Sequence, residues 1–168
     1  MKIYTRRGDA GESDLLGGVR ALKSDERFCA LGDLDELSAS LGLLKCLVCP
    51  EDQVFIDQIQ KDIMTMMAHV AALGSKVLLE HPFPSGLECH FERRIDALCD
   101  AMPSAFMLPG VNESSARANL SRTVARRAER SLVTLGWEYP LSVDAVKYTN
   151  RLSDYLYALS VSLSNIKG

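Results

Sequence analysis

The chain has 168 residues, of which 47% are apolar and 24% are charged, and its net charge at pH 7 is −3. This length is enough for one domain with its own core, and the slight negative charge excludes a general attraction to nucleic acid or acidic membranes. No apolar run is long enough for a membrane span, and the first residues lack the apolar segment of a signal peptide. We therefore expect one cytoplasmic domain over residues 1–168.

The five cysteines are an odd number in a chain without an export signal, which favours reduced thiols. Cys46 and Cys49 have the spacing of metal ligands, and Cys89 with His90 would be needed to complete a zinc site. Only one such cysteine pair is present, and it follows an apolar helical pattern. Zinc binding is therefore the less favoured interpretation.

Residues 1–30 form a polar stretch that contains four glycines after a β-prone start at residues 3–5. Glycines allow backbone N–H groups to approach an anion closely. The stretch is not a Walker A loop, because no Gly-Lys-Ser or Gly-Lys-Thr follows the glycines. The residues alone are consistent with two interpretations, an ordinary surface loop and an anion-binding loop.

From residue 31 onwards, apolar residues recur at helical spacing. We expect helices over about 31–48, 54–79, 87–102, 112–135 and 142–165, with no convincing sheet. Pro50 is expected to close the first helical region. Asn112 is expected to cap the fourth helix, and Gly136 to end it. The pattern predicts an all-α five-helix bundle over residues 31–165. The broad apolar faces of several helices also indicate a homo-oligomer.

Acidic residues lie near the expected start of the first helix, at Asp33, Asp35 and Glu36. Their simplest interpretation is that they complement the dipole of that helix.

The fourth helix is unusual in its arginines, which are Arg117, Arg122, Arg126, Arg127 and Arg130. Three of them, at spacing i, i+4 and i+8, form one stripe roughly 80° wide. Leu120, Val124, Ala128 and Leu135 are predicted to face the core. A solvated helix face is the ordinary interpretation of such a stripe. Guanidinium groups also suit phosphate oxygens, or carboxylates from a neighbouring chain.

Three segments together resemble the PduO-type family of ATP:corrinoid adenosyltransferases. The first two are KIYTRRGDAGESDLLGG at residues 2–18 and GDLDELSASLG at residues 32–42. The third is FMLPGVNESSARANLSRTVARRAER at residues 106–130, extended by YTNRLSDYLYAL at residues 148–159. The segments follow the family's order and spacing, and the RTVxRRAER and NRLSD patterns are long and specific.

The resemblance implies a homotrimer of five-helix bundles that binds ATP and a corrinoid between subunits. It also implies a reaction in which the Co(I) centre of a reduced cobalamin attacks the 5′ carbon of ATP. Triphosphate leaves, and adenosylcobalamin is formed. A reductase that acts on cob(II)alamin and an enzyme that uses adenosylcobalamin are the implied partners, and Mg²⁺ accompanies ATP.

The resemblance also assigns roles to residues. The loop that closes on ATP, which is the N-terminal part of residues 1–30, would contain Thr5, Gly8, Asp9, Gly11 and Ser13, with Lys23 nearby. The positions that hold phosphates, Mg²⁺ or adenosine are Arg126, Glu129, Arg130 and Asn150, with Glu129 as the magnesium candidate.

Two further matches concern the active site between subunits. Asp35 and Arg122 match a pair that joins neighbouring subunits, and Phe106 matches an aromatic residue beside the lower face of the corrin. An apolar side chain there would exclude the lower axial ligand and make cobalt easier to reduce. Together with Arg126, these residues are the predicted catalytic set.

The sequence departs from the family's pattern in the ATP loop. Ala10 replaces a usual lysine, and Glu12 and Asp14 replace a usual threonine and serine. Acids beside a triphosphate weaken its binding unless Mg²⁺, Arg6, Arg7 or Lys23 offsets them. These departures keep an alternative function open, in which the protein binds or delivers a corrinoid and has lost efficient use of ATP.

Overall fold

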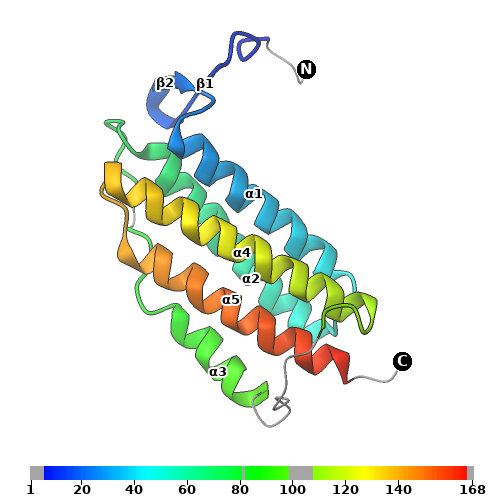
Figure 1. Cartoon of the computed structure of the whole chain (residues 1–168). Helices are drawn as coiled ribbons and strands as arrows, with labels where there is room; N and C mark the ends of the chain where they lie inside the picture. The colour runs from blue at the N-terminus through cyan, green and yellow to red at the C-terminus, as the bar shows by residue number, and fades with distance from the viewer. Residues whose placement is uncertain (1–5, 81, 99–107, 166–168) are drawn as a thin grey trace.

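The computed structural model describes residues 6–80, 82–98 and 108–165, and most of these residues are helical (Figure 1). The helices are α1 (Glu26–Lys45), α2 (Pro50–Ala72), α3 (Glu88–Leu98), α4 (Glu113–Glu138) and α5 (Val143–Ser164). α4 packs against both α1 and α5, while the short α3 packs on α5. The predicted five-helix bundle is confirmed.

The core is organised around α5. Tyr148 and Tyr155 of this helix are almost completely buried and contact Phe91 of α3, with ring centroids 4.9 Å and 5.8 Å away. Phe55 of α2 lies edge-on to Tyr155 at 5.3 Å. The Phe91–Tyr148 and Phe55–Tyr155 rings meet edge to face, an arrangement that adds specific geometry to a large buried apolar area. They hold α2 and α3 against α5.

Three helix boundaries in α1 and α2 differ from the prediction. α1 begins at Glu26 because the Asp25 side chain caps it by accepting a hydrogen bond from the backbone N–H of Arg27. Pro50 does not close α1 but starts α2, where its missing N–H and fixed φ are favourable. α2 ends at Ala72 instead of residue 79, and Gly74 follows in the left-handed conformation with φ +74°.

The boundaries of α4 show one prediction confirmed and one wrong. Asn112 caps the helix as predicted, because its side chain accepts the Ser115 N–H at 2.8 Å. Gly136, however, does not end α4. The helix continues to Glu138 and stops before Pro140, because the residue that precedes a proline is disfavoured in helical conformation.

The buried face of α4 contains small residues as well as larger ones, and Val124, Ala128 and Leu135 belong to it as predicted. Leu120 is instead 47% exposed. At about 100° per residue, Leu120 lies at the edge of the buried face, so this prediction was wrong.

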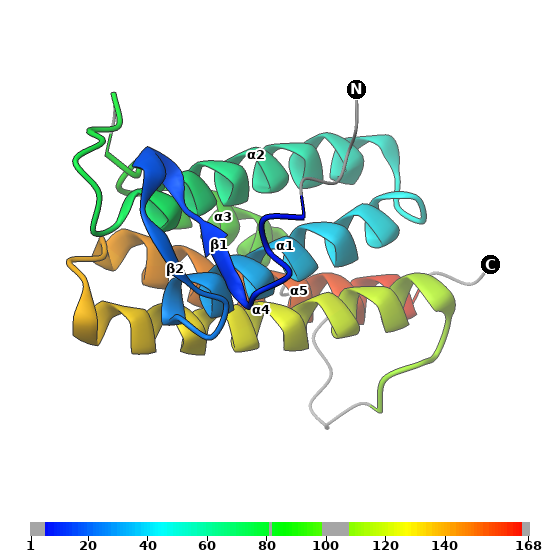
Figure 2. The ribbon, with the colours of Figure 1, turned by 90° about the horizontal axis from the view of Figure 1, so that it is seen from above.

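A short β-hairpin precedes the bundle, where the sequence analysis expected no sheet. β1 (Glu12–Asp14) pairs antiparallel with β2 (Arg20–Leu22), and the 3-10 turn η1 (Leu16–Gly18) connects them. Figures 1 and 2 show the hairpin at the N-terminal end of α1. It is held there partly by η1, which contacts the C-terminal end of α2. Within the described residues, no helix is long and apolar enough to cross a membrane.

Candidate functional site

The arginine stripe of α4 lies on the side of the helix away from the core. Arg126 and Arg130 are exposed and Arg122 is half-buried. Arg130 donates to the backbone carbonyl of Arg126 at 3.1 Å, and Arg122 donates through Nε to the Asn119 side chain at 2.8 Å. The same face continues with Trp137, which is 81% exposed. α4 thus presents cationic groups and an exposed aromatic ring on one surface.

Glu129 and Asn150, both predicted to hold ATP or its metal, are in direct contact. The Asn150 side-chain amide donates to Glu129 Oε1 at 2.9 Å, which links α4 to α5. Both residues are half-buried. Because Glu129 lies three residues after Arg126, the pair is next to the arginine stripe. The structure therefore brings this part of the predicted site together.

The acids of α1 do not have the role that their expected position suggested. Since α1 begins at Glu26, Asp33 and Glu36 lie beyond its first turn, where the dipole effect has faded. Instead, Arg127 of α4 donates to Asp33 at 2.8 Å and forms an ion pair with Glu36. These carboxylates raise the pKa of Arg127, chiefly through its hydrogen bond to Glu36. Arg127 therefore joins α4 to α1 and is not part of the exposed stripe.

Asp35 and Arg122 are not brought together within one chain. Asp35 is exposed, and its carboxylate makes no hydrogen bond or ion pair with the described residues. Arg122 contacts Asn119, which in turn donates to Ser160 at 3.4 Å. The Arg122 side chain also borders a shallow pocket of about 260 Å³ between Pro109 and the first turns of α4.

The N-terminal loop residues that the resemblance assigned to ATP lie close to one another. The Lys23 backbone N–H donates to the carbonyl of Gly11 at 2.8 Å. A methyl group placed on Gly8 would lie 3.1 Å from Lys23 Nζ, so the lysine amine lies directly against this glycine. Gly11 has φ +84°, a conformation that favours glycine. Asp9 continues the same turn, with its N–H directed to the Arg6 carbonyl.

Sequence reasoning missed one residue of this loop, Arg20. Its Nε donates to Glu12 at 2.7 Å and its Nη1 to Asp14 at 3.2 Å, while its Nη2 donates to the Arg7 carbonyl at 2.9 Å. The hydrogen bond with Glu12 is the largest cause of a raised Arg20 pKa. The available signal was the alternation of Glu12, Ser13 and Asp14, which places the two acids on one face of a strand.

Apart from Asp35 on α1, the described residues of the predicted site form two groups. One contains the loop residues Gly8, Asp9, Gly11, Ser13 and Lys23, and the other contains the α4 and α5 residues, with no hydrogen bond or ion pair joining the two groups in a single chain. Thr5 and Phe106 lie outside the described residues.

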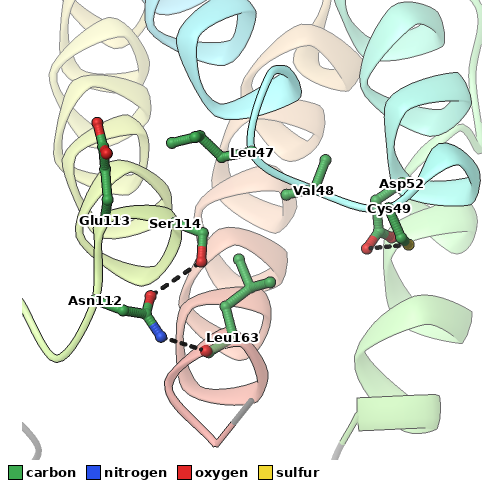
Figure 3. Close-up of a pocket in the computed structure, with 8 residues that line it drawn as sticks. All are labelled: Leu47, Val48, Cys49, Asp52, Asn112, Glu113, Ser114 and Leu163. Carbon is green, nitrogen blue, oxygen red and sulfur yellow. Dashed lines mark hydrogen bonds between the residues drawn. The ribbon is translucent and has the colours of Figure 1, made fainter. Parts of the chain in front are cut away.

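A separate pocket of about 370 Å³ lies where the turn after α1 meets the start of α4 and the end of α5 (Figure 3). Asn112 contributes to it and donates to the carbonyl of Leu163 at 2.8 Å. Cys49 also borders the pocket, with its thiol directed to Asp52. Of the predicted site residues that the structure describes, none lines it.

Comparison with known proteins decides the family. The family model for cobalamin adenosyltransferase matches residues 3–163. The chain belongs to this family. It is 39% identical to the corrinoid adenosyltransferase PduO of Citrobacter freundii over 164 residues, covering 95% of this chain but 49% of that protein. The chain thus spans about half the length of the first curated relatives that it matches. A cobalamin adenosyltransferase of Cupriavidus metallidurans is 37% identical, and the match covers 99% of this chain and 90% of that protein.

Solved structures of the family have the same fold. A phenylalanine-to-histidine variant of a PduO-type ATP:corrinoid adenosyltransferase from Lactobacillus reuteri, complexed with cobalamin and ATP, matches with a TM-score of 0.88 and 30% identity. The match covers 97% of this chain and 91% of that one. An arginine-to-lysine variant of the enzyme from the same organism, complexed with ATP, has a TM-score of 0.84.

Proposed function

We propose that this chain transfers the 5′-deoxyadenosyl group of ATP to the Co(I) centre of a reduced corrinoid, and that it releases triphosphate. The observation that carries this proposal is the exposed arginine stripe beside the Glu129–Asn150 contact. The chain also belongs to a family in which a solved relative is complexed with both cobalamin and ATP.

The chemistry requires charge stabilisation more than acid–base groups. Co(I) is itself the nucleophile, and negative charge develops on the triphosphate as its bond to carbon breaks. Arg126 and Arg130 are exposed and positioned on one helix face, where they are suited to binding phosphate oxygens. The loop with Gly8, Gly11 and Lys23 would supply backbone N–H groups and an ammonium group to the same phosphates.

The residues present fit a magnesium ion that arrives with ATP. No group of three or more acidic, histidine or cysteine side chains forms a metal site among the described residues. Mg²⁺ is usually held by one or two carboxylates together with substrate phosphates and water. Glu129 offers such a carboxylate, since Asn150 occupies only its Oε1. The ion would neutralise phosphate charge.

A homotrimer would give Asp35 and Arg122 the oppositely charged partners that they lack among the described residues of one chain. Asp35 shares an exposed face of α1 with Leu43, which is 53% exposed, and Arg122 shares a face of α4 with Trp137. Arginine and tryptophan are enriched in protein interfaces. Asp35 of one subunit would thus pair with Arg122 of the next, beside the position proposed for Phe106 at the corrin.

An anaerobic assay with chemically reduced cobalamin and MgATP tests the activity through the absorbance of light-sensitive adenosylcobalamin. We expect Arg126→Ala to lower the rate by about 100-fold or more, as loss of one group that stabilises developing charge does. Arg117→Ala is the matched control, because Arg117 lies on the same helix and pairs with the exposed Glu113. An unchanged rate in Arg126→Ala would contradict the phosphate role.

A charge exchange tests the pairing between subunits. Asp35→Arg and Arg122→Asp should each lower activity and weaken the trimer, because like charges then meet across the interface. The double variant restores opposite charges and should regain the trimer in light scattering. If wild-type protein is monomeric at micromolar concentration, the proposed interface is wrong.

The second candidate function is corrinoid binding and delivery without efficient use of ATP, and Ala10 favours it because one phosphate-binding charge is missing. A corrinoid spectrum that shifts on binding, without formation of the cobalt–carbon bond, would support it. Under either function we propose a cytoplasmic protein. A cob(II)alamin reductase would supply its substrate, and an adenosylcobalamin-dependent enzyme would receive its product.

A further inference from the structure

We propose that Arg20 is a positioning residue that makes the ATP loop of this chain compatible with its two unusual acids, Glu12 and Asp14. This inference rests on the proposed function, since it concerns how ATP reaches the same loop. Arg20 does not itself contact the nucleotide in this proposal. It acts by holding the two carboxylates on the face of the hairpin opposite Ser13. It also fixes the turn that contains Arg7 and Gly8.

The register of the hairpin separates the acids from the predicted nucleotide side. Asp14 lies opposite Arg20, Glu12 opposite Leu22, and Ser13 opposite Ala21. Because side chains alternate along a strand, Glu12, Asp14 and Arg20 share one face and Ser13 has the other. On the first face Asp14, Arg20 and Leu22 are exposed and Glu12 is half-buried, and on the other face Ser13 and Ala21 are half-buried. The acids thus point away from the side on which Ser13 would meet ATP.

A single guanidinium group binds both acids and the loop. Arg20 uses Nε for Glu12, Nη1 for Asp14 and Nη2 for the carbonyl of Arg7, at 2.7 Å, 3.2 Å and 2.9 Å. The planar fork of arginine presents donors to three acceptors from three separate nitrogens, whereas the three donors of a lysine side chain all lie on one nitrogen. Through Arg7, the same side chain fixes the start of the turn that contains Gly8.

The charge balance explains why this matters for ATP. With Arg20 present, the three side chains carry a net charge of about −1, and without it they carry about −2. A methyl group on Gly8 would lie 3.5 Å from the Glu12 carbonyl oxygen and 3.1 Å from Lys23 Nζ, so the acidic strand lies beside the loop that is predicted to bind phosphates. Charges interact over roughly 8 Å at physiological salt. Loss of Arg20 would therefore leave both carboxylates unpaired near the triphosphate and release them to turn towards Lys23.

A double-mutant cycle tests the proposal with the full-length protein. We expect Arg20→Ala to raise the KM for ATP by roughly tenfold with little change in kcat. The substitution weakens nucleotide binding and leaves the groups that act during adenosyl transfer in place. In the E12T/D14S background the same substitution should change KM by less than about twofold, because no acids remain to be compensated. Arg20→Lys should give an intermediate KM.

The matched control is Lys45→Ala. Lys45 forms a pair of the same kind with Asp57 at 2.7 Å, between α1 and α2, and its loss should leave the KM for ATP unchanged. If Arg20→Ala raises KM equally with and without Glu12 and Asp14, Arg20 contacts the phosphates itself and the proposal is overturned.

Hydrogen exchange separates this proposal from the proposed function. The N–H groups of Leu15 and Lys23 are bonded to Val19 and Gly11 across the hairpin, at 2.7 Å and 2.8 Å. Their exchange should accelerate several-fold in Arg20→Ala and return towards the wild-type rate in Arg20→Lys. This readout needs no ATP. Unchanged exchange would overturn the positioning role even in an active enzyme, whereas accelerated exchange in a protein that never uses ATP would reject only the function.

Discussion

Two arginines seven residues apart hold acidic partners in opposite surroundings. Arg27 is only 6% exposed, and it makes two hydrogen bonds of 2.8 Å to the Asp25 carboxylate and one of 2.9 Å to the Leu73 carbonyl. Its guanidinium also lies over the Tyr139 ring, 4.9 Å from the centroid. The side chain of Arg20, in contrast, is 40% exposed, although it has just as many acceptors.

The number of contacts that an arginine makes does not determine their contribution to stability. Water can solvate the acids that Arg20 leaves behind, so an exposed ion pair contributes little to folding. Asp25 would be left with its charge largely removed from water, at the point where α1, α2 and the end of α4 meet. Arg27 therefore stabilises the fold, whereas Arg20 orders a local loop.

The largest predicted effect is on stability when Arg27 is removed. We expect Arg27→Ala to lower the free energy of unfolding by about 3 kcal/mol, since a mostly buried carboxylate loses its partner. In the same urea titrations, followed by circular dichroism, the unfolding midpoint of Arg20→Ala should be indistinguishable from that of wild type. Equal losses in the two variants would mean that burial does not distinguish these arginines.

Two glycines test the same comparison through the backbone. Gly74 has φ +74°, and a methyl group on it would lie 3.0 Å from Arg27 Nη1, whereas Gly11 has φ +84° with open space around it. Left-handed strain alone costs about 1 to 2 kcal/mol for alanine. Gly74→Ala should therefore lose about 2 kcal/mol or more, because it also displaces Arg27. Gly11→Ala should lose less stability. In thermal melts the midpoint of Gly74→Ala should therefore be the lower of the two, and the reverse order would contradict the prediction.

The helical part of the fold was predictable because its signals are local. Leucines at three and four residue spacing fixed the existence of α1, and the side chain of Asn112 capped α4 as expected. Boundaries were less accurate where one residue type has two uses. Pro50 either closes a helix or opens one, and only the packing of α2 decides between them.

The pairing of charges was not predictable in the same way. Asp33 and Arg127 are 94 residues apart in sequence, and Arg20 meets Glu12 only because a three-residue strand pairs in one register. Such contacts depend on tertiary geometry that no local pattern contains. The contact between Glu129 and Asn150 was anticipated only as a shared role, through the resemblance to a family.

The smallest effect that we predict is a pH dependence from the partner of the buried arginine. The hydrogen bond from Arg27 lowers the pKa of Asp25 below its usual value of 3.8. A carboxyl with a lower pKa in the folded state binds fewer protons there than in the unfolded state, so it stabilises the fold above pH 3.8. That contribution is lost as the pH falls through the lower, folded-state pKa.

Asp25→Asn isolates this contribution because it removes the titrating group and keeps the size of the side chain. Urea unfolding from pH 7 down to about pH 2 should show a shallower loss of stability in the variant than in wild type. The two curves should differ in slope only at the acid end of this range. Parallel curves over the whole range would mean that Asp25 titrates alike in both states. The Arg27 contact would then position α1 without adding electrostatic stability, and the contrast with Arg20 would rest on burial alone.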